Sequence, residues 1–339
     1  MSMEWELRKA ALIVVKDMLH LKEGETVLIY ADTTSDRRVV ESIAAAAYAA
    51  GGEVGLYWYE TRPEVGMEPP KPLAAAMKAV DINVEIAEKY LIHTEAYHEA
   101  LRAGARNMCL TGMTPDMMIR CIGQINYPKM VELGDTLAEL TRNAQTMKIS
   151  APAGTELTCK LDSRPVFHNS GVITKPGDQS FLGGQVSWAP VEETINGKLV
   201  FDGALWPPEE IGLLKTPIDL TIEQGVVTGI QGGSEARVFE SWVKNLDDPN
   251  MYKIAHYSYG FNPGARLTGK ILEDERVFGS IELGIGSQRP RFKGTVGPAK
   301  AHTDGIILNP TIELDGIVIE KKGRYVHPKL ARISEAFGG

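Results

Sequence analysis

The sequence predicts an α/β protein of two domains, in which a parallel-sheet α/β domain precedes a mostly antiparallel, β-rich (α+β) domain. Two observations lead to this expectation. In residues 1–146, strand-like apolar runs alternate with helical stretches, as in parallel sheets whose strands are joined by helices. From residue 147 onward, short strands separated by turn residues dominate. We therefore expect the domains to be 1–146 and 147–339, and 339 residues suffice for two cores.

The elements of the first domain follow from apolar spacing and boundary residues. Apolar positions in residues 7–18 fit one face of a helix, and the polar run 33–36 offers N-caps for an alanine-rich helix that ends at Gly51-Gly52. No glycine-rich nucleotide-binding motif follows any strand. We expect strands at 25–30, 53–59 and 106–110, and further helices at 37–50, 73–80, 94–103, 115–122 and 128–145.

The second domain is expected to consist of antiparallel strands. One helix interrupts them before the final third of the chain, which is again β-rich. Asn196-Gly197 is a strong hairpin signal, and the strands 218–222 and 226–230 should form a pair. We expect further strands at 148–152, 156–161 and 198–201, and a helix at 234–245.

Composition is typical of a soluble globular protein, with 43% hydrophobic and 24% charged residues. The net charge of −8 argues against binding nucleic acid through the bulk field, and the N-terminus contains too many charges for a signal peptide or a membrane span. The three cysteines, without a CxxC pattern, are expected to be reduced, buried thiols of a cytoplasmic protein.

The tripeptide His302-Thr303-Asp304 is the main candidate for a metal site. In an extended backbone, residues two apart point to the same side, so the imidazole and the carboxylate would converge. The apolar run 306–308 predicts a buried strand that would anchor the pair. His256, in another strand-like stretch, is the best third ligand, and two histidines with one carboxylate suit iron(II) or a similar divalent metal. A hydrogen-bonded pair without a metal is the alternative.

Three segments resemble the aminopeptidase T family of metallopeptidases. They are LGGQVSWAPVEETINGKLVFDGA (182–204), IAHYSYGFNPGARLTGKILEDERVFGSIELGIG (254–286) and AHTDGII (301–307). By this resemblance, the chain retains two residues of the peptidase catalytic pattern, His302 and Asp304. At four other positions of the pattern it has different residues from the peptidases, namely Gln185, His256, Glu282 and Arg289. Two metals held about 3.5–4 Å apart need more carboxylates, so the peptidase function is disfavoured.

The same substitutions resemble the 2,5-dihydroxypyridine 5,6-dioxygenase family, non-haem iron(II) enzymes of nicotinate breakdown. This resemblance implies a ring-cleaving dioxygenase whose Fe(II) is held by His256, His302 and Asp304, with a small heteroaromatic substrate and O₂. It also implies a homo-oligomer, a dimer or larger. The family has histidines near the segment 175–183 that this chain lacks, so the substrate could be a related diol. The alternatives are a metal-dependent hydrolase of the aminopeptidase family and, more distantly, a metal-free binding protein.

Further residues are assigned to the site with less specific signals. By the resemblance, His93 is the acid–base group; the alternative is that it caps the helix beginning at Thr94. Arg289 and Arg291 could clamp a substrate oxyanion or lie in a solvated loop, and Tyr257 could stack a heterocycle or form part of one strand face. Glu282 is expected to orient a ligand histidine, the alternative being a simple strand carboxylate.

Overall fold

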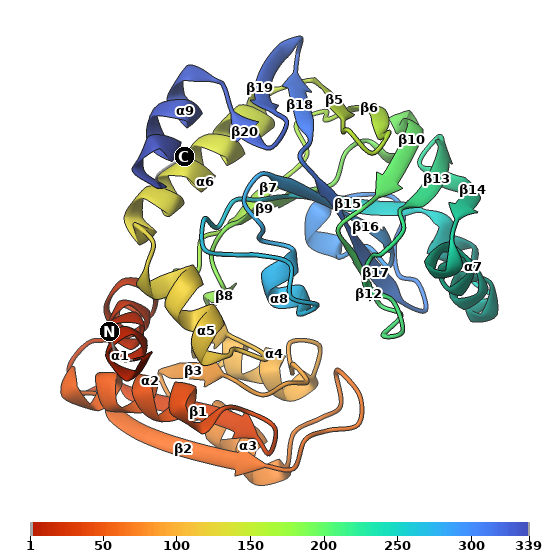
Figure 1. The fold of residues 1–339 in the computed structure, drawn as a ribbon. Coiled ribbons are helices and arrows are strands. Elements are labelled where there is room, and N and C mark those ends of the chain that lie inside the picture. Colours follow the sequence, from red (N-terminus) through yellow and green to blue (C-terminus); the bar gives the residue numbers. More distant parts are fainter. Residues whose placement is uncertain (1–2, 338–339) are drawn as a thin grey trace. The chain divides into compact units, whose positions relative to one another are not determined.

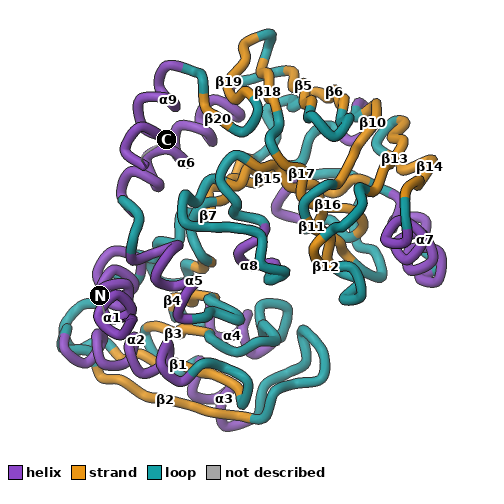
Figure 2. Tube along the Cα trace, in the orientation of Figure 1, coloured by secondary structure: helices purple, strands orange, loops and turns teal. Residues whose placement is uncertain are grey.

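A computed structural model describes residues 3–337 of the chain, which divide into two compact units (Figures 1 and 2). The first unit comprises Met1–Ile125 and Asn169–Gly183, and the second Asn126–His168 and Gly184–Gly339. Helices and strands alternate in the first unit, whereas strands predominate in the second. The expected α/β class, with a parallel-sheet domain and an antiparallel β-rich domain, is confirmed.

The first unit is built on a five-stranded parallel sheet in the order β2-β1-β3-β4-β8. Its strand β1 is apolar on both faces because helices cover both: Leu28 and Tyr30 of β1 pack with Leu73 of α3 and Tyr97 of α4, while α2 buries Ile43. The strands are β1 (Thr26–Asp32), β2 (Glu53–Tyr59), β3 (Ile82–Glu85), β4 (Arg106–Cys109) and β8 (Gln179–Phe181). The helices are α1 (Met3–Ile13), α2 (Arg37–Ala49), α3 (Lys71–Met77), α4 (Glu95–Arg102) and α5 (Pro115–Met118), with π-helical turns at Val14–Met18 and Ile119–Gly123.

The expected strands and helices of this unit are present, with ends shifted by a few residues. Two strands were not expected, β3 and β8, because runs of four and three residues are too short to show a period. Their pairing also moves the domain boundary. β8 pairs in parallel with β4, so residues 169–183 return to the first unit, and α6 (Tyr127–Asn143) belongs to the second. The observed division therefore differs from the expected boundary between residues 146 and 147.

The second unit consists of two antiparallel sheets. One has eight strands in the order β14-β13-β10-β6-β5-β18-β19-β20, and the other has seven in the order β12-β11-β17-β16-β15-β9-β7. The eight-stranded sheet contains β5 (Thr146–Ser150), β6 (Glu156–Lys160), β10 (Asn196–Phe201), β13 (Ile218–Glu223), β14 (Val226–Gly232), β18 (Thr311–Leu314), β19 (Ile317–Lys321) and β20 (Arg324–Tyr325). The seven-stranded sheet contains β7 (Val166–Asn169), β9 (Gln185–Trp188), β11 (Ala204–Trp206), β12 (Gly212–Leu213), β15 (Ile254–Gly260), β16 (Ser280–Gly286) and β17 (His302–Leu308). The remaining helices are α6, α7 (Ser234–Leu246), α8 (Ile271–Asp274) and α9 (Pro328–Ser334).

Most of the expected β elements are found, including the antiparallel pair of β13 and β14. The hairpin expected at Asn196-Gly197 is wrong. Both residues open β10, and Gly197 is paired with Leu157 of β6 and Ile222 of β13, so the dipeptide lies inside the sheet. A Cβ at Gly197 would lie 2.0 Å from the carbonyl oxygen of Glu156, and its φ is +129°, so a close strand contact explains this glycine.

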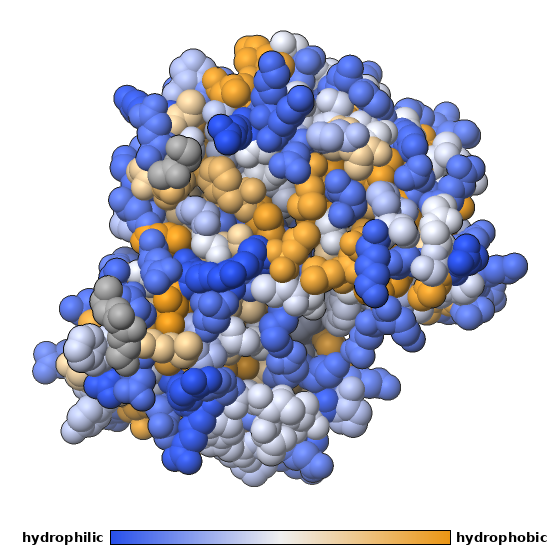
Figure 3. Space-filling model, in the orientation of Figure 1, coloured by the Kyte–Doolittle hydropathy of each residue, from blue (hydrophilic) through white to orange (hydrophobic). Residues whose placement is uncertain are grey.

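The polar surface and the state of the cysteines were both expected from the composition. Hydrophilic residues predominate on the face drawn in Figure 3. The three cysteines are free and buried, as expected. Within residues 3–337, no helix has both the length and the apolar character that a membrane crossing requires.

Candidate metal centre

The candidate site lies on one face of the seven-stranded sheet, where β15, β16 and β17 run side by side. Residue alternation separates the two faces of β16: Ser280, Glu282, Gly284 and Gly286 point one way, and the isoleucines and the leucine between them point the other. The register places His256 opposite Gly284 and Gly284 opposite Asp304. Directly opposed residues share a face, so the polar side chains of three strands gather on the face of Glu282.

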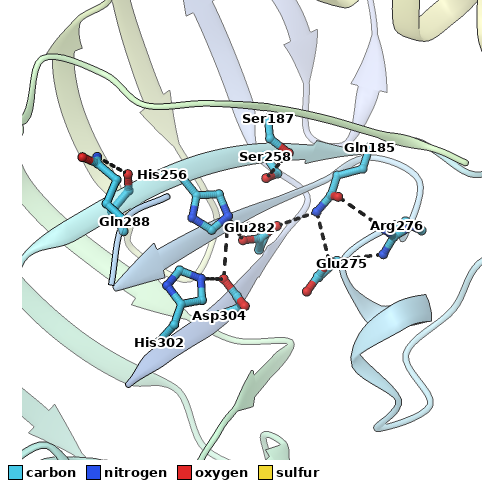
Figure 4. A network of polar contacts seen from close by, with 11 residues as sticks. Gln185, Ser187, His256, Ser258, Glu275, Arg276, Glu282, Gln288, His302 and Asp304 are labelled. Atoms are coloured by element: carbon cyan, nitrogen blue, oxygen red, sulfur yellow. Dashed lines mark hydrogen bonds and ion pairs between the residues drawn. The ribbon is translucent and has the colours of Figure 1, made fainter. Parts of the chain in front are cut away.

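His256, His302 and Asp304 meet on this face, as the sequence predicts (Figure 4). One ligand atom from each lies within 4.8 Å of the other two. The Asp304 Oδ1 atom is 2.9 Å from His302 Nε2 and 3.8 Å from His256 Nε2, and the two rings stack at 5.1 Å between centroids. Among the described residues, this is the group of histidine, cysteine or carboxylate side chains arranged to hold a metal ion.

Gly284 provides the space in which the two histidines lie. A Cβ built on this glycine would lie 2.2 Å from His256 Nδ1 and 2.8 Å from His302 Cε1. The φ of Gly284 lies outside the left-handed region, so backbone conformation does not require a glycine. The histidine rings therefore require a residue without a side chain at position 284.

Burial tunes the protonation of the donor atoms. It lowers the pKa of His256, against the opposing effect of Glu282, and together with the charge of Arg289 it lowers the pKa of His302 to about 4. Both imidazoles are thus neutral at pH 7 and retain a lone pair for a metal. Burial raises the pKa of Asp304 and of Glu282, so the site holds carboxyl groups whose ionisation a bound cation would favour.

A network of buried polar groups adjoins the three residues (Figure 4). Glu282 Oε1 lies 2.8 Å from His256 Nε2, and Gln185 Nε2 donates to Glu282 Oε2 at 2.8 Å and to Glu275 Oε2 at 3.0 Å. Arg276 donates to Gln185 Oε1 at 3.4 Å and to Glu275 at 3.2 Å. These contacts fix the orientation of the Gln185 amide and hold the Glu282 carboxyl beside His256.

The connection between β16 and β17 is fastened by a buried glutamate. Glu192 Oε1 accepts hydrogen bonds from Gln288 Nε2 at 2.8 Å and from the Thr295 amide at 3.0 Å, and Arg164 pairs with Glu192 Oε2 at 2.9 Å. Burial opposes ionisation of Glu192, but these contacts outweigh it and lower its pKa. Gln288 also donates to the carbonyl oxygen of Ala255, next to His256, so the loop is tied to the strand that carries His256.

This loop carries an aromatic ring and two arginines. The Phe292 ring stacks on the His256 ring at 5.4 Å and an interplanar angle of 15°. The Arg291 guanidinium lies 4.7 Å from the centre of the Phe167 ring and 5.3 Å from that of Phe292. Burial, followed by the charge of Arg289, lowers the pKa of Arg291 to about 10, which leaves it protonated at pH 7.

Two of the predicted site residues are placed differently. Tyr257 lies on the opposite face of β15 from His256, fully buried, with its ring 6.0 Å from that of Trp188. It is part of the core, because alternate residues of a strand face opposite ways, and it is not retained as a substrate-binding residue. His93 belongs to the first unit and is exposed in the turn before α4. Thr94, not His93, caps that helix, since its hydroxyl accepts the Tyr97 amide at 3.2 Å.

Sequence reasoning did not identify Glu192, Gln288, Phe292 or the role of Gly284. Glu192 lies within the quoted segment 182–204, but a glutamate next to another gives no sign of which one is buried. The alternation in SIELGIG (280–286) could have drawn attention to Gly284 and Gly286, because both glycines are on the polar face of a strand between the two histidine-bearing strands.

Comparison with known proteins identifies relatives of this chain. The family model of 2,5-dihydroxypyridine 5,6-dioxygenase matches residues 15–327. The 2,5-dihydroxypyridine 5,6-dioxygenase of Pseudomonas putida is 26% identical over 296 residues, which cover 84% of this chain and 81% of that protein.

Solved structures show the same fold. The structure of the 2,5-dihydroxypyridine dioxygenase from Pseudomonas putida has a TM-score of 0.80 at 22% identity, covering 98% of this chain and all of that one. Wild-type AmpT from Thermus thermophilus has a TM-score of 0.67 at 15% identity, covering 96% of this chain and all of that one.

Proposed function

The chain belongs to the 2,5-dihydroxypyridine 5,6-dioxygenase family, and from this we propose that it is an iron(II)-dependent dioxygenase that opens the ring of a dihydroxypyridine-type diol. The observation that carries the proposal is the match to this family over residues 15–327, which include the whole polar face with His256, His302 and Asp304. A role in nicotinate breakdown is part of the same proposal.

The three side chains fit a divalent iron. Two neutral imidazoles and one carboxylate are the donor set of iron(II) oxygenases, and the glycine at position 284 leaves the rings free to converge. His256, His302 and Asp304 would hold the ion, and Glu282, which lies 2.8 Å from His256 Nε2, would orient the ring of a His256 that binds the ion through Nδ1. Iron(II), when bound, supplies the electron transfer between an electron-rich diol and O₂.

The remaining residues bind the substrate and move its proton. His93 would take the proton of a substrate hydroxyl, which makes the ring more electron-rich, since an imidazole can act as a general base. Arg289 and Arg291 would orient the substrate through its oxygen atoms. Both oxygen atoms of O₂ end in the opened product, and the diol supplies the electrons, so no external reductant is consumed.

Two assays on one preparation test the function. Protein purified without oxygen and loaded with iron(II) should consume one O₂ per molecule of 2,5-dihydroxypyridine or of a related diol. Release of amino acids from small peptides, with zinc or cobalt added, should be absent. Peptide cleavage without diol-dependent oxygen uptake would refute the proposed dioxygenase activity and favour a hydrolase on the fold shared with AmpT.

The ligand set is tested by metal content. His302→Ala and Asp304→Ala should lose the metal yet remain folded, because the ligands stand on a packed sheet. His327→Ala is the matched control, since His327 lies outside the candidate site. Metal content equal to that of the unchanged protein in both ligand variants would contradict the proposed site.

We also propose a homo-oligomer, a dimer or larger, acting in the cytoplasm. Light scattering at micromolar concentration should give a multiple of the 37.1 kDa chain mass, and a monomer would count against the proposal.

A further inference from the structure

We infer that Arg289 and Arg291 form a subsite for a carboxylate, so that the natural substrate is a dihydroxypyridine-type diol that also carries a ring carboxylate. This inference rests on the proposed function and narrows its substrate class. It starts from two guanidinium groups in one short segment of the loop between β16 and β17.

Neither arginine has an acidic partner in residues 3–337, and the Nε atom of Arg291 is buried without a hydrogen-bond partner. The rings of Phe167 and Phe292 contact the Arg291 guanidinium but do not neutralise its charge. The half-buried cation of Arg291 is costly unless an anion compensates it, so its missing partner is expected to be a bound anion, and the exposed Arg289 stands two residues away.

The arginines are close to the candidate metal centre. Phe292 stacks directly on the ligand His256, and Arg291 lies over the Phe292 ring, so one aromatic ring separates the guanidinium from a ligand histidine. A six-membered ring bound at the metal could therefore reach the arginines with a substituent.

The segment is held in place before any ligand arrives. Glu192, Gln288 and Thr295 fasten the loop on either side of the two arginines, and Arg164 donates to the carbonyl oxygen of Lys293 at 2.7 Å. Positively charged groups held by a fixed backbone lose little entropy on binding, as in built anion sites.

A carboxylate fits this pair better than a hydroxyl of the diol. A guanidinium presents two parallel N–H groups to two oxygen atoms of a planar anion, and a carboxylate also brings a full negative charge to the pair. A neutral hydroxyl satisfies neither condition, and a deprotonated one offers a single oxygen atom. The arginine pair would thus explain selection for an acidic diol, a property that the three metal ligands alone do not provide.

Binding without turnover tests the inference separately from the reaction. Iron(II)-loaded protein is titrated without oxygen by calorimetry with 2,5-dihydroxypyridine and with its 3-carboxylate and 4-carboxylate. The variants are Arg289→Gln, Arg291→Gln and Arg291→Lys, and Arg324→Gln, an exposed arginine on β20, is the matched control. Since Arg291 packs on two rings, the exposed Arg289 provides a variant that leaves the fold unaffected.

The unchanged protein should bind one of the carboxylated diols at least about 10-fold more tightly than the plain diol. Each glutamine variant should lose this preference, Arg291→Lys should keep part of it, and Arg324→Gln should keep all of it. Equal or tighter binding of the plain diol, or a preference that persists in both glutamine variants, would overturn the inference. Oxygen uptake with the plain diol, measured in parallel, decides the proposed function independently, because it does not depend on the carboxylate preference.

Discussion

Replacing Gly284 by alanine should abolish tight metal binding without unfolding the protein. The added Cβ would lie 2.2 Å from His256 Nδ1, whereas ordinary van der Waals contact begins at 3.4 Å, so the ring would have to retreat by about 1.2 Å. Metal–ligand distances tolerate deviations of only about 0.2 Å. His302 is also affected, because its Cε1 would lie 2.8 Å from the new methyl group.

The expected loss follows from these distances. Mutating the groups that position metal ligands costs about 10–100-fold in metal affinity, and displacing two ligands together should reach the upper end of that range or exceed it. The cost in stability should be about 1–3 kcal/mol, as for other overpacked sites, because the methyl group faces two side chains and not the core between the sheets.

The assay is anaerobic titration with iron(II), or with cobalt(II) as a spectroscopic probe, accompanied by thermal unfolding. Gly229→Ala on β14 is the matched control: its Cβ would meet nothing nearer than Thr221 Oγ1 at 3.5 Å, and its φ also lies outside the left-handed region. Unchanged affinity in Gly284→Ala would refute the argument that these rings and this glycine define the metal site.

Three further predictions concern other parts of the molecule. Burial raises the pKa of Glu320, whose two carboxyl oxygens have no hydrogen-bond partner, so its contribution to stability is full below the unfolded pKa near 4.5 and declines as the pH rises toward the folded pKa. Between pH 5 and pH 8, the free energy of unfolding of Glu320→Gln should therefore rise relative to that of the unchanged protein by up to about 1.4 kcal/mol per pH unit, as measured by thermal unfolding. The same pH dependence of stability in both proteins would contradict this. His93→Ala should keep its iron but lose about 10²–10⁴-fold in turnover, with His98→Ala on the exposed side of α4 as control; equal turnover in both variants would remove His93 from the mechanism. Glu192→Gln should loosen the loop between β16 and β17, so trypsin should cleave after Lys293 several-fold faster, and an unchanged rate would show that the glutamate does not hold the loop.

The sequence predicts those parts of the site that depend on local geometry. His302 and Asp304 converge because alternate residues of a strand share a face, which holds wherever the strand lies. The contact of His256 with them depends instead on the register of three strands across Gly284, which no local pattern encodes.

Tertiary contacts also explain the wrong expectations. Asn196-Gly197 has the composition of a hairpin turn, but pairing with β6 and β13 places it within a strand. Tyr257 has an aromatic ring that could stack on a heterocycle. It follows His256 directly in the strand, however, so it faces the opposite way and lies in the core. Glu192 gives no local sign that it fastens a loop about a hundred residues further along the chain, because its partners are brought to it by the fold.

The alternation along β16 has a consequence for how this scaffold can change. Even-numbered positions, such as Glu282 and Gly284, adjoin His256 on the polar face, and odd-numbered positions, such as Ile281 and Leu283, lie in the core. Substitutions can therefore exchange ligands on one face while the packing on the other stays intact, so a new reaction need not cost the fold its stability. The same arrangement tolerates no shift of register. Deleting one residue from β16 would turn its isoleucines toward the histidines and its glutamate into the core. The candidate metal site and the core packing would then be lost together.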